Sequence, residues 1–129
     1  MGNGFRELRV WRDAKGVAVE VYQLIRRSPA LDKDWGLKDQ MQRAAVSVAS
    51  NIAEGDARKS DKDSIRFFHI ALGSLSELIT QLEIAFALSM VEQNECVELV
   101  ARLEDLSQRI GALIKSRRTP GAQSQEPSA

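Results

Sequence analysis

The sequence predicts an all-α protein, folded as an antiparallel up-down-up-down four-helix bundle. Apolar residues recur at three- and four-residue spacing along four long segments joined by short connections. Three prolines and no run of turn dipeptides argue against a many-stranded sandwich. A chain of 129 residues is long enough for one core. We therefore expect one domain over residues 1–118 and a disordered polar tail over 119–129.

The first two helices are expected at about residues 8–27 and 35–54. The first carries a wide apolar stripe, and Ser28-Pro29 ends it because proline disfavours the helical conformation in the residue before it. The second is apolar around most of its circumference, which predicts enclosure on more than one side. Gly55 follows directly and is predicted to end this helix as a left-handed C-cap.

The last two helices are expected at about residues 61–89 and 92–118. Ser60 can cap the third helix, whose apolar residues form a heptad seam. The predicted core positions of the two helices are Ile65, Phe68, Leu72, Leu75, Ile79, Leu82 and Phe86, and Cys96, Leu99, Leu103, Leu106, Ile110 and Leu113.

The overall charge gives no general attraction to nucleic acid or to an anionic membrane, because 18 basic residues balance 18 acidic ones. The single cysteine excludes an internal disulfide. No stretch approaches the roughly 18 consecutive apolar residues of a membrane span, and the N-terminus has no apolar signal region. These features predict a cytoplasmic protein that does not bind membranes.

We find no arrangement of residues that predicts catalysis, a metal site or a cofactor. A di-iron bundle uses Glu-x-x-His pairs, but the one histidine, His69, has Arg66 three residues before it. Cys96 lies on a predicted core seam without a neighbouring base, so a structural thiol is expected. No glycine-rich phosphate loop is present. The chain is therefore predicted not to be an enzyme, with no cofactor and no small-molecule substrate.

Two basic clusters make nucleic-acid binding an alternative. One lies at the start of the first helix, and the other at the turn between the second and third helices. Such clusters can neutralise phosphates. Because acidic residues interleave with the second cluster, a solvated, charge-balanced surface is the favoured explanation. The candidate residues for binding nucleic acid are Arg6, Arg9, Arg12, Arg58, Lys59 and Lys62.

Three segments, in order, carry a family resemblance: FRELRVWRDA, GLKDQMQRAAVSVASNIAEG and RFFHIALGSLSELITQLEIA. They resemble the bacterial, ribosomal-protein-like four-helix bundle proteins encoded by intervening sequences of 23S ribosomal RNA genes. These are distantly similar to the accessory protein of diversity-generating retroelements. The resemblance covers about residues 5–118. It implies an antiparallel bundle that assembles into a ring-shaped homopentamer, with a link to ribosomal RNA or other nucleic acid.

The function expected from this resemblance is a non-enzymatic scaffold or adaptor whose main partner is another copy of itself. The alternative is an RNA- or DNA-binding accessory protein that uses the basic patches of the assembled ring. Ile70, Ile84 and Leu88 lie off the main seam and offer apolar surface for subunit contact. Asp56 and Ala49 depart from the family pattern, in which a bulkier residue and a proline are usual.

The positions that match the family pattern are expected to have structural or interface roles. They form two polar lines, one on the second helix and one on the third, which we expect to meet each other or a neighbouring subunit. We also expect hydrogen-bond partners for Arg43 and Glu54, since an enclosed, unpaired charge is costly. The candidate structural or interface residues are Gln40, Arg43, Asn51, Glu54, Gly55, Gly73, Ser74 and Glu77.

Overall fold

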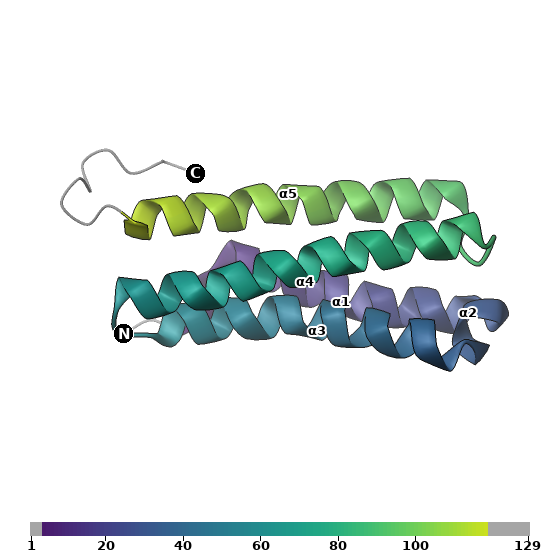
Figure 1. Ribbon diagram of the computed structural model, residues 1–129, viewed down its shortest axis with the longest axis horizontal. Helices are drawn as coiled ribbons and strands as arrows, with labels where there is room; N and C mark the ends of the chain where they lie inside the picture. Colours follow the sequence, from purple (N-terminus) through teal and green to yellow (C-terminus); the bar gives the residue numbers. More distant parts are fainter. Residues whose placement is uncertain (1–3, 119–129) are drawn as a thin grey trace.

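In a computed structural model of the chain, residues 4–118 are described, and four long α-helices form a helical bundle (Figure 1). These helices are α1 (Arg9–Arg27), α3 (Trp35–Ala57), α4 (Asp61–Ala87) and α5 (Gln93–Arg118). A 3-10 turn, η1 (Gly4–Glu7), precedes α1, and the short helix α2 (Pro29–Lys33) links α1 to α3. Over residues 4–118 there is no β-strand. The predicted tail at 119–129 lies outside the described residues.

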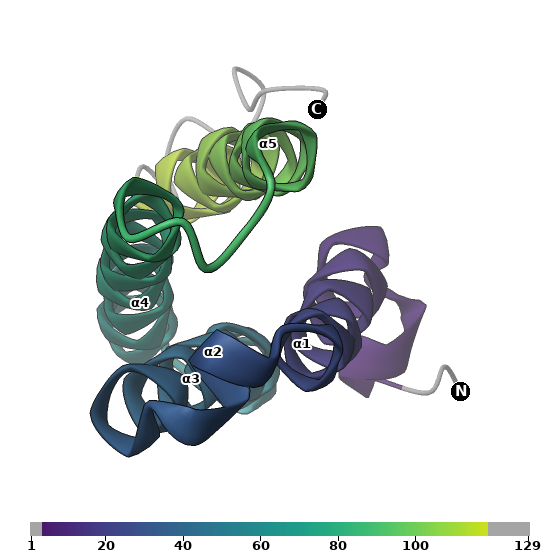
Figure 2. The same cartoon turned by 90° about the vertical axis from the view of Figure 1, so that its right-hand side faces the viewer.

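The helices follow one another around the bundle in the order α1, α3, α4, α5, so that α5 lies next to α1 (Figure 2). Hydrogen bonds and ion pairs between helices give the relative directions of neighbouring helices. Ser74 bonds to Ser47 and Ser64 to Gly55, so α3 and α4 run in opposite directions. Asp13 pairs with Arg109, whereas Arg27, further along α1, pairs with Glu95, earlier on α5. Thus α1 and α5 also run in opposite directions.

Side-chain caps set several helix boundaries. The Ser28 hydroxyl accepts a hydrogen bond from the Leu31 backbone N–H and donates one to the Met90 carbonyl, which joins the α1–α2 and α4–α5 connections. Asp34 caps α3 through the Leu37 N–H. Ser60 caps α4 through the Asp63 N–H, the capping role that the sequence predicts. The helix α2 was not predicted, because five residues are too few for a periodic pattern.

The prediction that Gly55 is a left-handed C-cap is wrong. Gly55 is buried inside α3, which continues to Ala57, and Gly55 is not among the residues with positive φ. The physical reason for a glycine lies across the helix pair, because the Phe68 ring of α4 packs directly on it. A Cβ at position 55 would lie 2.6 Å from Phe68 Cε1. Here glycine provides space for an aromatic ring rather than an unusual backbone angle.

The core face of α4 is rotated relative to the prediction. Phe68, Leu75 and Leu82 are fully buried as expected, but Ala71, Leu78 and Ala85 complete the buried face. The predicted core positions Ile65, Leu72 and Ile79 are only half-buried, and Phe86 is exposed. On α5, Ile114 takes the place predicted for Leu113, which is half-buried. Both errors arise because apolar residues occupy two adjacent stripes, and periodicity does not tell which one faces inward.

By length and composition α4 could cross a membrane. Its most apolar 18-residue window has a mean hydropathy of 1.3, and 39% of that window is buried within the bundle. No other helix in residues 4–118 meets this criterion. The core helix of a folded bundle has the same composition, and Phe68, Leu75, Leu78 and Leu82 of α4 are all fully buried in the core. The burial of these side chains accounts for part of the apolar composition of α4, because Ile70, Ile84 and Phe86 are apolar but exposed.

Candidate functional site: the α3–α4 groove

The polar lines of α3 and α4 adjoin along one side of the bundle. The Ser74 hydroxyl donates a hydrogen bond to Ser47 Oγ over 2.7 Å. Asn51 Nδ2 donates to the same oxygen and to the Ser47 carbonyl, each over 2.9 Å. Asn51 is half-buried and Ser74 is buried. Asn51 and Ser74 therefore bind a common hydroxyl at the base of the contact between the two helices.

An open groove of about 320 Å³ lies beside this hydroxyl contact. We call it the α3–α4 groove, and its lining residues are Gln40, Arg43, Ala44, Ser47, Glu77 and Gln81. Five of the six lining residues carry a polar group at a helical spacing of three or four residues: Gln40, Arg43 and Ser47 on α3, and Glu77 and Gln81 on α4. The groove therefore places a guanidinium, a carboxylate, two carboxamides and a hydroxyl around one open space.

The Gln81 side chain is the least satisfied group in this groove. Gln81 is only 9% exposed, and its Oε1 is buried without a hydrogen-bond partner in the described part of the protein. Leaving a buried polar atom unpaired costs about 1–3 kcal/mol. Sequence analysis missed this residue, although its spacing of four from Glu77 continues the polar line of α4. A group that donates a hydrogen bond to Gln81 would recover this cost.

The charges around the groove are only partly neutralised. Glu54 forms an ion pair with Arg58, the C-cap residue of α3. Over residues 4–118, no hydrogen bond or ion pair is present for the side chains of Arg43 and Glu77. Within the described part of one subunit, the expected partner is therefore present for Glu54, whereas Arg43 is exposed and has none, so a partner for Arg43 from a neighbouring subunit stays a prediction. Arg43 and Glu77 are available to a molecule that docks on this side.

The remaining family-pattern positions lie on the same two helices. Gly73 is exposed on α4, with open space where a Cβ would be. At Gly55, by contrast, the Phe68 ring occupies that space. Ile70 and Ile84 lie seven residues before and after Glu77, so they share its face of α4. They are 42% and 45% exposed, and Leu88, one turn beyond Ile84, is 57% exposed. The α3–α4 side therefore combines unpaired polar groups with exposed apolar side chains.

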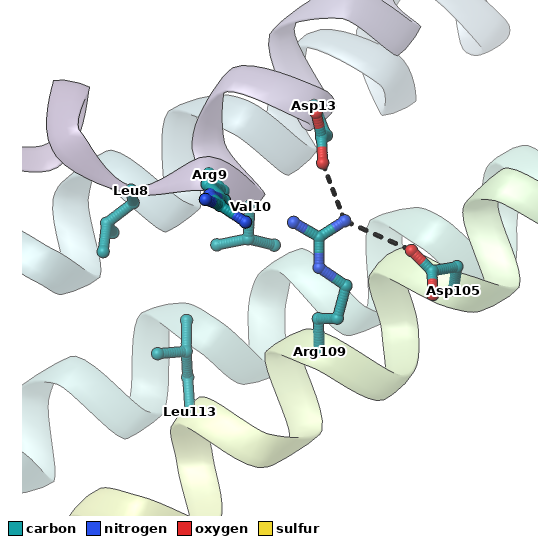
Figure 3. Close-up of a pocket in the computed structure, with 7 residues that line it drawn as sticks. All are labelled: Leu8, Arg9, Val10, Asp13, Asp105, Arg109 and Leu113. Atoms are coloured by element: carbon teal, nitrogen blue, oxygen red, sulfur yellow. Dashed lines mark hydrogen bonds and ion pairs between the residues drawn. The ribbon is translucent and has the colours of Figure 1, made fainter. Parts of the chain in front are cut away.

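A second and larger groove, of about 590 Å³, lies between α1 and α5. We call it the α1–α5 groove, and its lining residues are Leu8, Arg9, Val10, Asp13, Asp105, Arg109 and Leu113 (Figure 3). Arg109 reaches across it to Asp13, at 2.8 Å, and also contacts Asp105 on its own helix, at 3.2 Å. The groove therefore has an apolar wall and an internally paired, charged rim.

Three ion pairs join α1 to α5 at heptad spacing. Asp13, Glu20 and Arg27 lie seven residues apart on α1, and they pair with Arg109, Arg102 and Glu95, respectively. Seven residues is close to two helical turns, so the three pairs lie along one line. All six side chains are at least 31% exposed, and each exposed pair contributes at most about 1 kcal/mol.

All six predicted nucleic-acid residues are exposed. Arg6 lies on η1 and Arg9 and Arg12 on the first turn of α1, whereas Arg58, Lys59 and Lys62 surround the α3–α4 turn. Because η1 contacts α3, the structure brings the two clusters toward one end of the bundle. Arg58 lies 4.6 Å from the centre of the Phe67 ring, and Arg66 lies 4.5 Å from it. Arg66 and Phe67 were not predicted as part of this basic surface.

The cysteine and the acidic side chains give no indication of catalysis. Cys96 is buried, and its thiol points to the Leu82 carbonyl at 3.8 Å. Burial raises the pKa of the Cys96 thiol, and the negative charge of Glu83 raises it further. The thiol is therefore protonated at neutral pH and a poor nucleophile. Within residues 4–118, no three or more His, Cys, Asp or Glu side chains are grouped as metal ligands.

Comparison with known proteins identifies relatives of this chain. The family model described as 23S rRNA-intervening sequence protein matches residues 6–112. A crystal structure of a protein of unknown function from the S23 ribosomal protein family of Bacteroides thetaiotaomicron superimposes with a TM-score of 0.75. The match covers 82% of this chain and 98% of the other at 20% identity, so it supports the fold alone. Among curated proteins no match was found.

Proposed function

We propose that this chain, which belongs to the 23S rRNA-intervening sequence protein family, is a non-enzymatic assembly protein. This family is not a known enzyme family. In the proposal, five copies of an antiparallel up-down-up-down bundle form a ring that acts as a cytoplasmic scaffold or adaptor. The α3–α4 groove is the surface through which one subunit binds the next.

The unpartnered Gln81 oxygen is the observation that carries this proposal. A buried carboxamide without a partner is costly in an isolated subunit, and docking a hydrogen-bond donor removes the cost. The same side presents Ile70, Ile84 and Leu88, whose burial between subunits is favourable at about 25 cal/mol per Å². Gly73 leaves open space for the close approach of another helix.

The mass of the protein in solution tests this proposal. Sedimentation velocity or light scattering at micromolar concentration is expected to give about five times the 14.3 kDa chain mass. Ile84→Glu is expected to shift the protein toward monomer, since it places a charge in the apolar part of the interface. The matched control is Val97→Glu, at an exposed valine on α5 away from the α3–α4 groove. A strictly monomeric wild-type protein would refute the assembly.

A second candidate function is binding of single-stranded RNA, favoured by the two guanidinium groups beside the Phe67 ring. Unstacked bases bind aromatic rings and arginine planes, and basic side chains nearby neutralise phosphates. The surface that combines Arg58, Arg66 and Phe67 provides both kinds of group. The name of the family links its members to 23S ribosomal RNA, which agrees with this candidate.

Fluorescence anisotropy with a single-stranded ribosomal RNA fragment, over a salt series, tests this second function. We expect Phe67→Ala to weaken binding by about 5- to 100-fold, the range for loss of one stacking platform. Lys62→Gln should reduce the salt slope by about 0.7. Trp35→Ala is the matched control, because the Trp35 ring also has a cation over it, Lys38 Nζ at 4.1 Å, but Trp35 begins α3, at the opposite end of that helix from Arg58. Binding that is insensitive to salt, or absent at low ionic strength, contradicts this candidate.

A further inference from the structure

We infer that the α3–α4 groove of one subunit binds the α1–α5 side of the next, so that the subunits join head to tail. This inference rests on the assembly proposed above and identifies its second surface. The α1–α5 side consists of the α1–α5 groove and the adjoining Glu20–Arg102 ion pair. It faces away from the α3–α4 side, because the helices follow the order α1, α3, α4, α5 around the bundle (Figure 2).

Two different surfaces on one subunit are what a closed ring requires. When a surface binds itself, assembly stops at a dimer, whereas head-to-tail contacts continue until the rotation closes. Each copy then offers one α3–α4 side and one α1–α5 side, and no surface remains unpaired. For the two sides to bind each other, they must also match in charge, in the position of their groups along the bundle axis, and in shape.

The charges on the two sides are complementary. The α3–α4 groove presents one cation, Arg43, and one anion, Glu77, that have no partner among residues 4–118. The α1–α5 side presents the Glu20–Arg102 pair, whose side chains are 40% and 48% exposed. Placed opposite each other, Glu20 would face Arg43 and Arg102 would face Glu77. A guanidinium has five N–H donors, so Arg102 can also donate to the unpaired Gln81 oxygen.

The charged groups of the two sides also lie at the same position along the bundle axis. The Cys96 thiol contacts the Leu82 carbonyl, and α4 and α5 run in opposite directions (Figure 1). Glu77 lies five residues before Leu82, about 7.5 Å along the helix axis, and is therefore level with Ala101, next to Arg102. The Ser47–Ser74 bond places Glu77 level with Ala44, next to Arg43. Two subunits that stand side by side at equal height therefore bring the four charges together.

The same register places an apolar side chain opposite the α1–α5 groove. Ile70 lies twelve residues before Leu82, so it is level with Gln108 on α5. Gln108 lies between Asp105 and Leu113, two residues that line the groove (Figure 3). Ile70 is 42% exposed, and the groove has the volume and the apolar wall to receive it. Charge, height and shape therefore favour the same pairing of sides.

Swapping charged pairs tests this pairing without breaking contacts within a subunit. Glu20→Arg combined with Arg102→Glu keeps the internal ion pair but reverses the charges that the α1–α5 side presents. Arg43→Glu combined with Glu77→Arg reverses the α3–α4 side. Each double variant is expected to assemble at least about tenfold more weakly, because like charges then meet across the interface. The quadruple variant should recover assembly, as opposite charges face each other again.

Sedimentation velocity over a dilution series measures these effects, and circular dichroism checks that each variant is folded. The matched control swaps Asp32 and Lys38, an ion pair away from both sides, and should leave assembly unchanged. If the wild-type protein is monomeric, the proposed assembly itself fails. If it assembles but the double variants assemble equally well, or the quadruple variant does not recover, the assembly stands and the pairing of these two sides is wrong.

Discussion

Gly55→Ala is expected to lower the free energy of unfolding by about 1 kcal/mol, although alanine is the better helix former. In an unobstructed helix this substitution would stabilise by about 1 kcal/mol. Here the new Cβ would meet the Phe68 ring at 2.6 and 2.8 Å and the Ser64 carbonyl oxygen at 3.1 Å. Phe68 is fully buried in the core, and in a densely packed interior its ring can move only by displacing its neighbours. Overpacking of this kind costs about 1–3 kcal/mol, and here it outweighs the gain in helix propensity.

Urea denaturation of Gly55→Ala and of a matched control measures this effect. The control is Gly73→Ala, since Gly73 is also inside a helix but has open space around its Cβ position. This control should raise the unfolding free energy by about 0.5–1 kcal/mol in the monomer. Phe68→Leu in the Gly55→Ala background should recover part of the loss, which gives a coupling energy between the two sites. Equal effects of the two glycine variants would show that the Phe68 contact is unimportant.

Gly55 also shows how far the sequence predicts this fold. Helix periodicity identified the four long helices, because it depends only on residues three and four apart. The reason for Gly55 depends on Phe68, thirteen residues away on another helix, and local patterns carry no such information. The rotation of α4 has the same origin, since Ile65 and Leu72 are as apolar as the residues that are buried. Only packing against α3 and α5 decides which stripe faces the core.

The candidate site was predictable in part. Its polar lines were visible as helical spacing in the sequence, and the structure adds that they adjoin through Ser47 and Ser74. Gln81 was missed because an isolated glutamine on a helix is normally solvated, and its burial is a tertiary property. The α1–α5 groove was missed for the same reason, since it exists only where residues about a hundred positions apart meet.

Gln81→Met is expected to raise the stability of the monomer and to weaken assembly. Methionine has nearly the same length and shape as glutamine, but it has no carboxamide oxygen to leave unpaired. Removing the buried, unpartnered oxygen should therefore stabilise the monomer by about 1 kcal/mol or more. In the proposed assembly this oxygen accepts a hydrogen bond from the neighbouring subunit. Its loss should raise the dissociation constant about tenfold, which corresponds to about 1.4 kcal/mol.

Opposite changes in stability and assembly distinguish a functional group from a packing group. Denaturation is measured at concentrations where the wild-type protein is monomeric, because assembly itself adds apparent stability. Gln40→Met, an exposed glutamine in the same groove, is the control and should change stability by no more than about 0.5 kcal/mol. If Gln81→Met destabilises the monomer, then the Gln81 carboxamide is already satisfied within one subunit. That outcome would remove the main physical reason for a partner at the α3–α4 groove, whatever the mass of the assembly.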